Sequence, residues 1–416
     1  MKRLLKYIII SAALFSGCTK AEEPLPAESG NVSKESGITA VSESAEGSSE
    51  PFSGYTFEFK GTAENYIVTV SQGEHPDEIA LCVEDNTYST KSFVITAPTG
   101  FAPKLPYEQS RAYSAVKLIS NDIDDTYIPD IMQFTFNSTE VGADNPLPAV
   151  SRMFTIDRDG ELREINMITR EDTDGDGEPE ETVHEYLDRT QLYHSEPDKF
   201  IYEITVDESS LYDDEGNPRP MESRVKIKTL KFEHNVPRLV ADYEEINENN
   251  PLYFGYACWA AANSAAQYFT MTPFNISDWE NNIEIPRSDN SGVSDYYFVI
   301  DDSRFTSVKD VKKYLKSIFT PKTAEELFAN APQKYRDIDG VLCGAAGNSE
   351  YDSSLGTLTF SGVSVTRDRM VFRSRQEKYD ESGRFTGYTD GGNFIIERNE
   401  DGMWRVSKYR YPYSFS

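Results

Sequence analysis

The stretch from Arg304 to Cys343 constrains the fold most, because it predicts two short helices and a tight hairpin in succession. Ser307 followed three residues later by Asp310 forms a capping box, which predicts that a helix starts there. Apolar residues then recur at helical spacing on one face, so this helix is expected to cover a core. The opposite face carries Lys309, Lys312, Lys313 and Lys316.

A second helix and a hairpin follow directly. Pro321 fits the first turn of a helix, and Thr323 with Glu326 forms a second potential capping box. Asp339-Gly340 lies between two apolar residues, which is a strong signal for a two-residue β-hairpin turn.

The rest of residues 247–416 predicts an α+β roll. Residues 252–269 form an alanine-rich helix pattern, residues 296–300 read as a strand, and a long run of strand segments follows the two capped helices. Such a roll has this order of elements: a helix, a strand, further helices and then antiparallel strands.

Residues 256–409 resemble the D,L-endopeptidase inhibitor family of Gram-positive bacteria, within the cystatin/NTF2-like group. The matching segments are Ala-Gln-Tyr-Phe at 266–269, Tyr-Tyr-Phe at 296–298, the run at 305–320, the hairpin at 339–342 and the closing run at 401–406. The resemblance implies an NTF2-like fold that binds a cell-wall peptidase and blocks its cleft. These segments bear on the fold, and no inhibitory residue is carried over with them.

Residues 53–246 predict a separate β-rich domain, either a sandwich or a blade-like array. Short segments rich in β-branched and aromatic residues alternate with turn signals, and no long helix pattern occurs. Cys82 lies in the apolar run 79–83 and is expected to be a buried thiol. Cys258 and Cys343 are expected to be buried and free as well, although an extracellular chain would permit a disulfide.

An acidic loop in this domain predicts a structural calcium ion. Carboxylates at alternate positions followed by glycine let one loop surround a hard cation, and the expected ligands are Asp172, Asp174, Asp176 and Glu180. The loop is no EF-hand, because Val183 stands where a bidentate Glu would be needed. It resembles the calcium loops of FG-GAP/integrin-type β repeats. A solvated acidic turn is the alternative.

A weaker copy of this loop lies fifty residues earlier. Asp122, Asp124 and Asp130 match the later loop at a constant offset, whereas Thr126 and Tyr127 replace an Asp and a Gly. This copy is expected to keep the turn without tight binding. The fifty-residue period is compatible with a repeat.

The N-terminus predicts a lipid-anchored surface protein. Residues 1–17 have a basic start and an apolar segment too short to span a membrane, and they end before Cys18 in a sequence that resembles a bacterial lipobox. Cys18 is therefore expected to carry lipid on the extracellular face of the cell membrane. Residues 18–52 are rich in Glu, Ser, Ala, Gly and Pro, which predicts a disordered tether.

The net charge of −29 is unevenly distributed. Residues 1–17 contribute +3 and residues 251–416 contribute −3, so residues 18–250 carry the whole of the −29. This acidity argues against nucleic-acid partners, and it either favours divalent cations or keeps a surface protein soluble.

No catalytic constellation is expected in residues 247–416, which contain no histidine. A Ser/His or Cys/His arrangement within this half is therefore excluded. Alternate basic residues near one strand form a possible docking patch for an acidic partner, or a solvated strand face. The patch consists of Arg367, Arg369, Arg373 and Arg375.

The sequence thus favours a non-enzymatic surface lipoprotein whose NTF2-like half binds a cell-wall hydrolase or another envelope component. Two alternatives remain open. One is a calcium-dependent adhesin for glycans, which needs exposed aromatic residues beside the loop at Asp172. The other is a pocket protein or enzyme that uses the NTF2-like cavity, which needs a deep pocket with converging Asp and Tyr groups.

Overall fold

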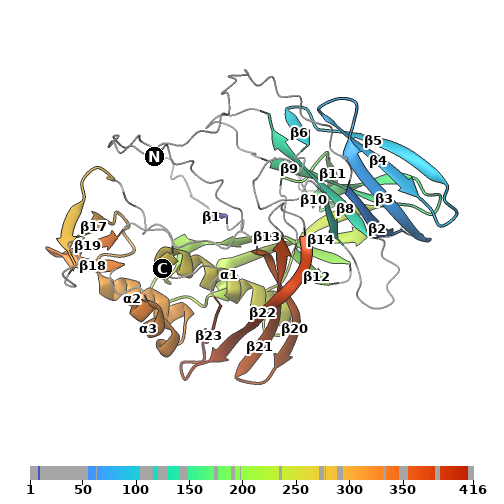
Figure 1. Cartoon of the computed structure of the whole chain (residues 1–416). Coiled ribbons are helices and arrows are strands. Elements are labelled where there is room, and N and C mark those ends of the chain that lie inside the picture. Colours follow the sequence, from blue (N-terminus) through green and yellow to red (C-terminus); the bar gives the residue numbers. More distant parts are fainter. Residues whose placement is uncertain are drawn as a thin grey trace, which may run out of the picture.

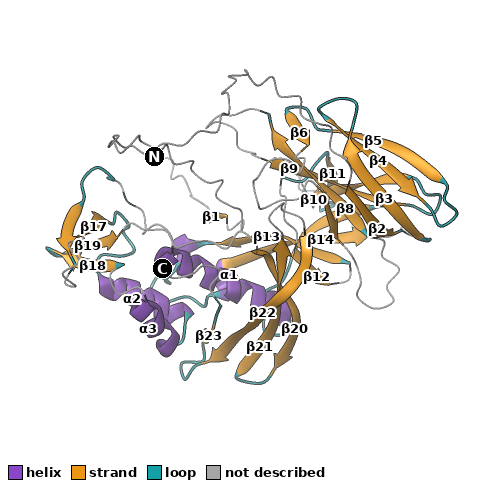
Figure 2. Ribbon diagram, in the orientation of Figure 1, coloured by secondary structure: helices purple, strands orange, loops and turns teal. Residues whose placement is uncertain are grey.

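The structure is a computed structural model in which strands predominate (Figure 2), which confirms the expected β-rich fold. It describes residues 8–9, 55–61, 63–103, 116–119, 130–139, 149–172, 177–188, 193–196, 198–233, 237–270, 276, 278–287, 294–330, 334–345, 355–379 and 385–410. In this part of the chain, no helix is long and apolar enough to cross a membrane.

Four antiparallel strands form the first sheet, in the order β2-β3-β4-β5. They are β2 (Tyr55–Lys60), β3 (Asn65–Gln72), β4 (Glu78–Glu84) and β5 (Thr90–Thr96). Side chains of β3 and β4 alternate between buried and more exposed positions, so only one face of the sheet is covered. Cys82 lies on the open face between buried Leu81 and Val83. The expectation of a buried Cys82 is therefore wrong, because the apolar run belongs to a half-covered strand.

The second sheet has eleven strands and extends from the first sheet to the C-terminal half (Figure 1). Its main path is β1-β13-β14-β15-β10-β9-β8-β6, and β10 pairs in parallel with β15. The strands are β1 (Ile8–Ile9), β6 (Phe101–Pro103), β7 (Val116–Ile119), β8 (Ile131–Ser138), β9 (Ala149–Ile156), β10 (Leu162–Glu171), β11 (Glu180–His184), β12 (Tyr193–Glu196), β13 (Lys199–Val206), β14 (Val225–Glu233) and β15 (Arg238–Tyr243). Two 3₁₀ turns, η1 (Glu208–Ser210) and η2 (Glu222–Arg224), lie between β13 and β14.

The first sheet and strands β8 and β9 share one hydrophobic core. Phe59, Val68 and Leu81 from the first sheet belong to the same buried cluster as Phe134 and Phe154 from the second. This burial explains why the strands on either side present apolar residues to each other.

Helix α1 (Pro251–Thr270) is the central element of the C-terminal half. It contacts β13 and β14 of the eleven-stranded sheet as well as all four strands of a further sheet, β20-β21-β22-β23 (Figure 1). Its alanines are fully buried, because small side chains allow close approach from several directions. The further sheet consists of β20 (Leu355–Val365), β21 (Arg369–Tyr379), β22 (Phe385–Arg398) and β23 (Trp404–Lys408).

Two short helices and a small sheet complete this half. Helix α2 (Val308–Ile318) begins at Ser307, and Ser307 and Asp310 form the predicted capping box. Helix α3 (Pro321–Asn330) follows, and the small sheet has the order β16-β17-β19-β18. Its strands are β16 (Ile283–Pro286), β17 (Ser294–Val299), β18 (Tyr335–Ile338) and β19 (Val341–Ala345).

The start of α3 differs from the prediction. The hydroxyl of Thr320 lies 3.4 Å from the backbone N of Thr323, so Thr320 occupies the position before the helix and Pro321 is its first residue. Thr323 therefore lies inside the helix, where its hydroxyl donates to the carbonyl of Ser407. The expected capping box of Thr323 and Glu326 is wrong, because the proline sets the start one turn earlier.

The hairpin prediction is confirmed: Asp339 and Gly340 join β18 and β19, and both have positive φ, at 50° and 81°. Cys258 and Cys343 are buried and free, as expected. One hydrophobic core contains side chains of β13 and β14, such as Ile204 and Ile227, together with those of α1, α2 and β21. This core therefore crosses the boundary placed at 246/247.

Candidate functional site

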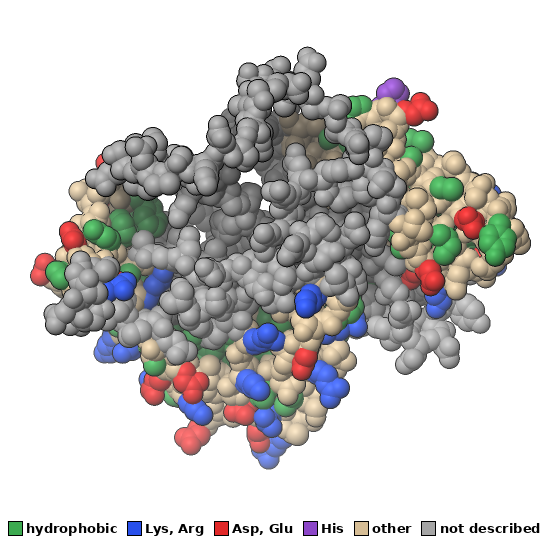
Figure 3. Space-filling model, viewed as in Figure 1, with side chains coloured by type: hydrophobic (Ala, Val, Ile, Leu, Met, Phe, Trp, Pro, Cys, Tyr) green, Lys and Arg blue, Asp and Glu red, His purple; other side chains and the backbone are tan. Residues whose placement is uncertain are grey.

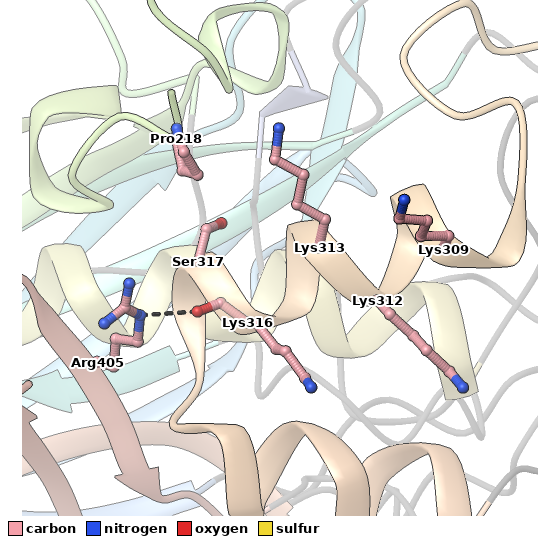
Figure 4. Close-up of a pocket in the computed structure, with 7 residues that line it drawn as sticks. All are labelled: Pro218, Lys309, Lys312, Lys313, Lys316, Ser317 and Arg405. Carbon is pink, nitrogen blue, oxygen red and sulfur yellow. Dashed lines mark hydrogen bonds between the residues drawn. The ribbon is translucent and has the colours of Figure 1, made fainter. Parts of the chain in front are cut away.

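The solvent-facing side of α2 borders an open pocket with a volume of about 450 Å³, and most of its lining residues are basic (Figure 4). We call it the α2 lysine surface. It is lined by Pro218, Lys309, Lys312, Lys313, Lys316, Ser317 and Arg405. The lining thus includes five cationic side chains and no acidic one, in a chain whose net charge is −29.

The amphipathic sequence of α2 creates this surface. Val311, Leu315 and Ile318 are fully buried in the core, so the helical period directs the lysines outward. In Figure 4, Lys309 and Lys313 extend to one side of the helix and Lys312 and Lys316 extend to the other. The four lysines are exposed.

A backbone carbonyl and two aromatic rings contact the lysines of α2 without cancelling their charge. The Nζ of Lys313 donates to the carbonyl of Gly216 at 3.2 Å and lies 4.7 Å from the ring centre of Tyr212. Lys312 lies 5.0 Å from the ring centre of Phe328. Within the described part of the chain, Lys309 has no ion-pair partner.

Two cations of the surface have carboxylate partners at its rim. Lys316 lies 3.4 Å from a carboxylate oxygen of Glu325, and both side chains are well exposed. Arg405 forms an ion pair with Asp401 and also donates from Nε to the carbonyl of Lys316 (Figure 4). The arginine thereby fixes β23 against the end of α2. Exposed pairs of this kind are weak, so Lys316 stays available to another anion.

A buried polar cluster fixes α2 from below. Glu208 of η1 is 6% exposed, and its carboxylate accepts hydrogen bonds from the hydroxyls of Ser264 at 2.5 Å and Tyr314 at 3.1 Å. Arg304 donates to the backbone carbonyl of Glu208 at 2.6 Å. Ser264 belongs to α1 and Tyr314 to α2, so the cluster joins three segments. Helix α2, which carries the lysines, is therefore fixed to η1 and, through Glu208, to α1.

The four predicted docking arginines lie on a different surface. Arg369, Arg373 and Arg375 are on β21, and Arg367 is in the turn before it. Figure 3 shows basic side chains gathered over the part of the molecule that holds β20–β22, with acidic ones among them. Arg369 pairs with Glu397 at 3.2 Å, and Arg375 lies 4.2 Å from the ring centre of Tyr388. Two of the four arginines are therefore engaged by residues of β22, which lies in the same sheet.

The predicted calcium loop is described only at its ends. Strands β10 and β11 pair antiparallel with Glu171 opposite Glu180, so the loop joins two hairpin strands. The carboxylate of Asp172 accepts a hydrogen bond of 3.0 Å from the backbone N of Gly177. Asp174 and Asp176 lie outside the described residues. Within the described ranges, no group of three or more His, Cys, Asp or Glu side chains is placed to hold a metal ion.

In the weaker loop, Asp122 and Asp124 lie outside the described residues, and Asp130 has a structural position. Asp130 is 4% exposed, and its Oδ2 accepts a hydrogen bond of 2.8 Å from the backbone N of Lys60. Its own backbone N donates to the carbonyl of Lys60. Asp130 thus joins the end of β2 to the start of β8. Cys18, the predicted lipidation site, also lies outside the described residues.

Aromatic rings fill the space between α1 and the β20–β23 sheet. The rings of Phe360 and Phe372 lie 5.0 Å apart, and Tyr256 of α1 packs 4.6 Å from Phe360. Burial raises the pKa of Tyr256 to about 12, and its hydroxyl accepts a hydrogen bond from the backbone N of Phe360. The hydroxyl of Tyr256 therefore stays protonated at neutral pH.

Sequence reasoning noted the lysines of α2 but did not identify them as a site. The available signal was four lysines within eight residues, whose only acidic neighbour, Asp310, is used by the capping box. The contributions of Pro218 and Arg405 depend on tertiary structure, because they come from segments about ninety residues to either side.

Comparisons with known proteins do not assign a family. No family model matches the chain, and no curated protein matches it. Among solved structures, the crystal structure of the GH43 BlXynB protein from Bacillus licheniformis gives a match with 9% sequence identity and a TM-score of 0.16. The match covers 86% of this chain and 57% of that chain. A TM-score this low supports no statement about fold or function.

Proposed function

We propose that this protein is a non-enzymatic binding protein of the bacterial cell surface, anchored by lipid on Cys18, whose α2 lysine surface binds an anionic component of the envelope. One observation carries the proposal: five cationic residues and no acidic one line the α2 lysine surface, in an otherwise acidic chain. The acidic half repels anions, so it leaves this surface as the favourable approach.

Close aromatic packing among the described residues of the C-terminal half supports binding rather than catalysis. An enzyme of this architecture needs a cavity in which acid and base groups meet the substrate. Here Phe360, Phe372 and Phe394 occupy the space between α1 and the sheet, with ring centres 5.0 to 5.9 Å apart.

The sequence resemblance suggests one such envelope component. Helix α2 lies within the segment that resembles the endopeptidase inhibitor family, so a cell-wall hydrolase with an acidic surface is the protein alternative to a non-protein anion at this surface. The arginines of β21 are the competing docking surface, and they provide a matched control because they carry similar charge on a separate element.

We also propose that the loop from Asp172 to Glu180 holds a structural calcium ion. The hydrogen bond from the backbone N of Gly177 to the carboxylate of Asp172 supports this, because it brings two described residues at the ends of the loop together, and a loop that surrounds a cation must bring its ends close. Calorimetric titration with calcium should give heat for the wild type and none for Asp172→Ala. Equal heats would remove the site.

Co-sedimentation with isolated cell envelopes tests the binding function. The purified wild type should sediment with the envelopes, and a variant with glutamine in place of Lys309, Lys312, Lys313 and Lys316 should stay in solution. A control variant with glutamine in place of Arg367, Arg369 and Arg373 should sediment like the wild type. Equal sedimentation of the lysine variant and the wild type would contradict the proposed surface.

A further inference from the structure

We infer that the ligand of the α2 lysine surface is a linear phosphodiester polymer of the cell wall. This inference rests on the proposed function and names the chemical class of its ligand. It follows from the spacing of the cations, from their identity, and from the absence of apolar and aromatic side chains other than Pro218 among the residues that line the surface.

The spacing of the cations requires a ligand with several charges. Lys309 and Lys316 are seven residues apart on one helix, which places their Cα atoms roughly 10 Å apart along the helix axis. Lysine side chains also leave the helix on both sides (Figure 4). A single phosphate group reaches only some of these lysines, whereas a flexible chain with several charges can contact lysines on both sides of the helix.

The identity of the cations favours phosphate over a protein partner. Four of the five are lysines, which can bind phosphate as point charges on flexible stems without the planar, bidentate geometry that arginine provides. Protein interfaces are instead poor in lysine and depend on aromatic and arginine anchors. Here the one arginine is engaged by Asp401, and the rings of Tyr212 and Phe328 lie against lysine side chains.

The lining residues also argue against nucleic acids and lipid surfaces. Binding of single-stranded nucleic acid depends on aromatic rings on which bases stack, and no lining residue is aromatic. Insertion into a membrane surface needs exposed apolar side chains beside the cations, and Pro218 is the one apolar lining residue. With these ligand classes disfavoured, a flexible polymer made of phosphates and short polar links fits the lining best.

Binding of inorganic polyphosphate, used as a probe for a base-free phosphate chain, tests the inference with the full purified protein. Its affinity should fall with salt with a slope of about −3 in log–log form, as expected when about four phosphates are neutralised. Orthophosphate should not compete at equal phosphate concentration. The four-lysine glutamine variant should bind at least about tenfold more weakly. The control variant with glutamine in place of Arg367, Arg369 and Arg373 should bind like the wild type.

Two further probes separate the alternatives. Poly-L-glutamate of matched charge represents an acidic protein, and phosphatidylglycerol vesicles represent a lipid surface. Equal or tighter binding of either probe would overturn the phosphate-polymer inference. If the protein sediments with envelopes through its lysines but does not bind polyphosphate, the proposed function stands and this inference fails. An unchanged melting temperature confirms that each variant is folded.

Discussion

The phenolic hydroxyl of Tyr314 donates a hydrogen bond of 3.1 Å to the carboxylate of Glu208, across 106 residues of sequence. The same carboxylate accepts from Ser264 of α1. One buried acid therefore holds α2 against α1 and against the connection between β13 and β14. The orientation of the α2 lysine surface depends on this cluster.

Removing this hydrogen bond should destabilise the protein. We expect Tyr314→Phe to lower the free energy of unfolding by about 2 kcal/mol, because the bond is buried and its acceptor is a carboxylate. Urea denaturation measures the change, and Tyr296→Phe, at an exposed tyrosine, is the control. A double-mutant cycle with Glu208→Gln should show coupling. Additive losses would mean that the two side chains do not act together.

Gly255 should not tolerate a methyl group, although it lies inside a helix. A Cβ at this position would lie 2.3 Å from a ring carbon of Phe372, and alanine would otherwise favour the helix by about 1 kcal/mol. We expect Gly255→Ala to lower the melting temperature, and Phe372→Leu in the same chain to recover part of the loss. A gain in stability for Gly255→Ala alone would refute the close packing of α1 on β21.

Lys334 should make stability increase with pH above neutrality. Burial lowers its pKa from 10.5 to about 8, and the side chain is 8% exposed. Between these two values the unfolded chain binds more protons than the folded one, so the free energy of unfolding rises with pH in this window. Lys334→Met should remove the rise, so its free energy of unfolding relative to that of the wild type should be highest at pH 7 and should fall towards pH 10.5.

Urea denaturation of both proteins from pH 7 to pH 10.5 checks this difference. It should shrink steadily above pH 8. The exposed Lys378 supplies the control Lys378→Met, which should follow the wild type. A difference that stays constant with pH would show that Lys334 does not titrate in this range.

The side chain of Arg224 should lower the free energy of unfolding of the protein. Its side chain is 3% exposed, and its Nε and both terminal nitrogens have no hydrogen-bond partner among the described residues. Because a buried guanidinium that makes no hydrogen bond is costly, Arg224→Met should raise the free energy of unfolding by about 1 to 3 kcal/mol. Chemical denaturation beside Arg219→Met, at an exposed arginine, measures this. Destabilisation instead would show that bound water or an ion satisfies the guanidinium.

Local signals in the sequence predicted many of the elements. The capping box at Ser307 and the turn at Asp339-Gly340 depend on neighbouring residues alone, and both are present. Helix α1 was recognised because its apolar and alanine positions recur over five turns. Such features need no information from distant parts of the chain.

The errors and omissions have tertiary causes. Cys82 was expected inside because nothing in the sequence shows that one face of the first sheet is uncovered. The core that joins β13 and β14 to α1 depends on contacts across the boundary at 246/247, which composition does not reveal. The α2 lysine surface likewise needs Pro218 and Arg405 from distant segments. Sequence periodicity placed the lysines outward but could not show what they adjoin.

Lysine footprinting of the protein on isolated envelopes tests the central claim most directly. Acetylation is compared with and without envelopes and located by mass spectrometry. Lys309, Lys312, Lys313 and Lys316 should be protected in the bound protein, whereas the exposed Lys378 and Lys408 of the β20–β23 sheet should remain fully labelled. Protection of Lys378 and Lys408 with unchanged labelling of α2 would contradict the account.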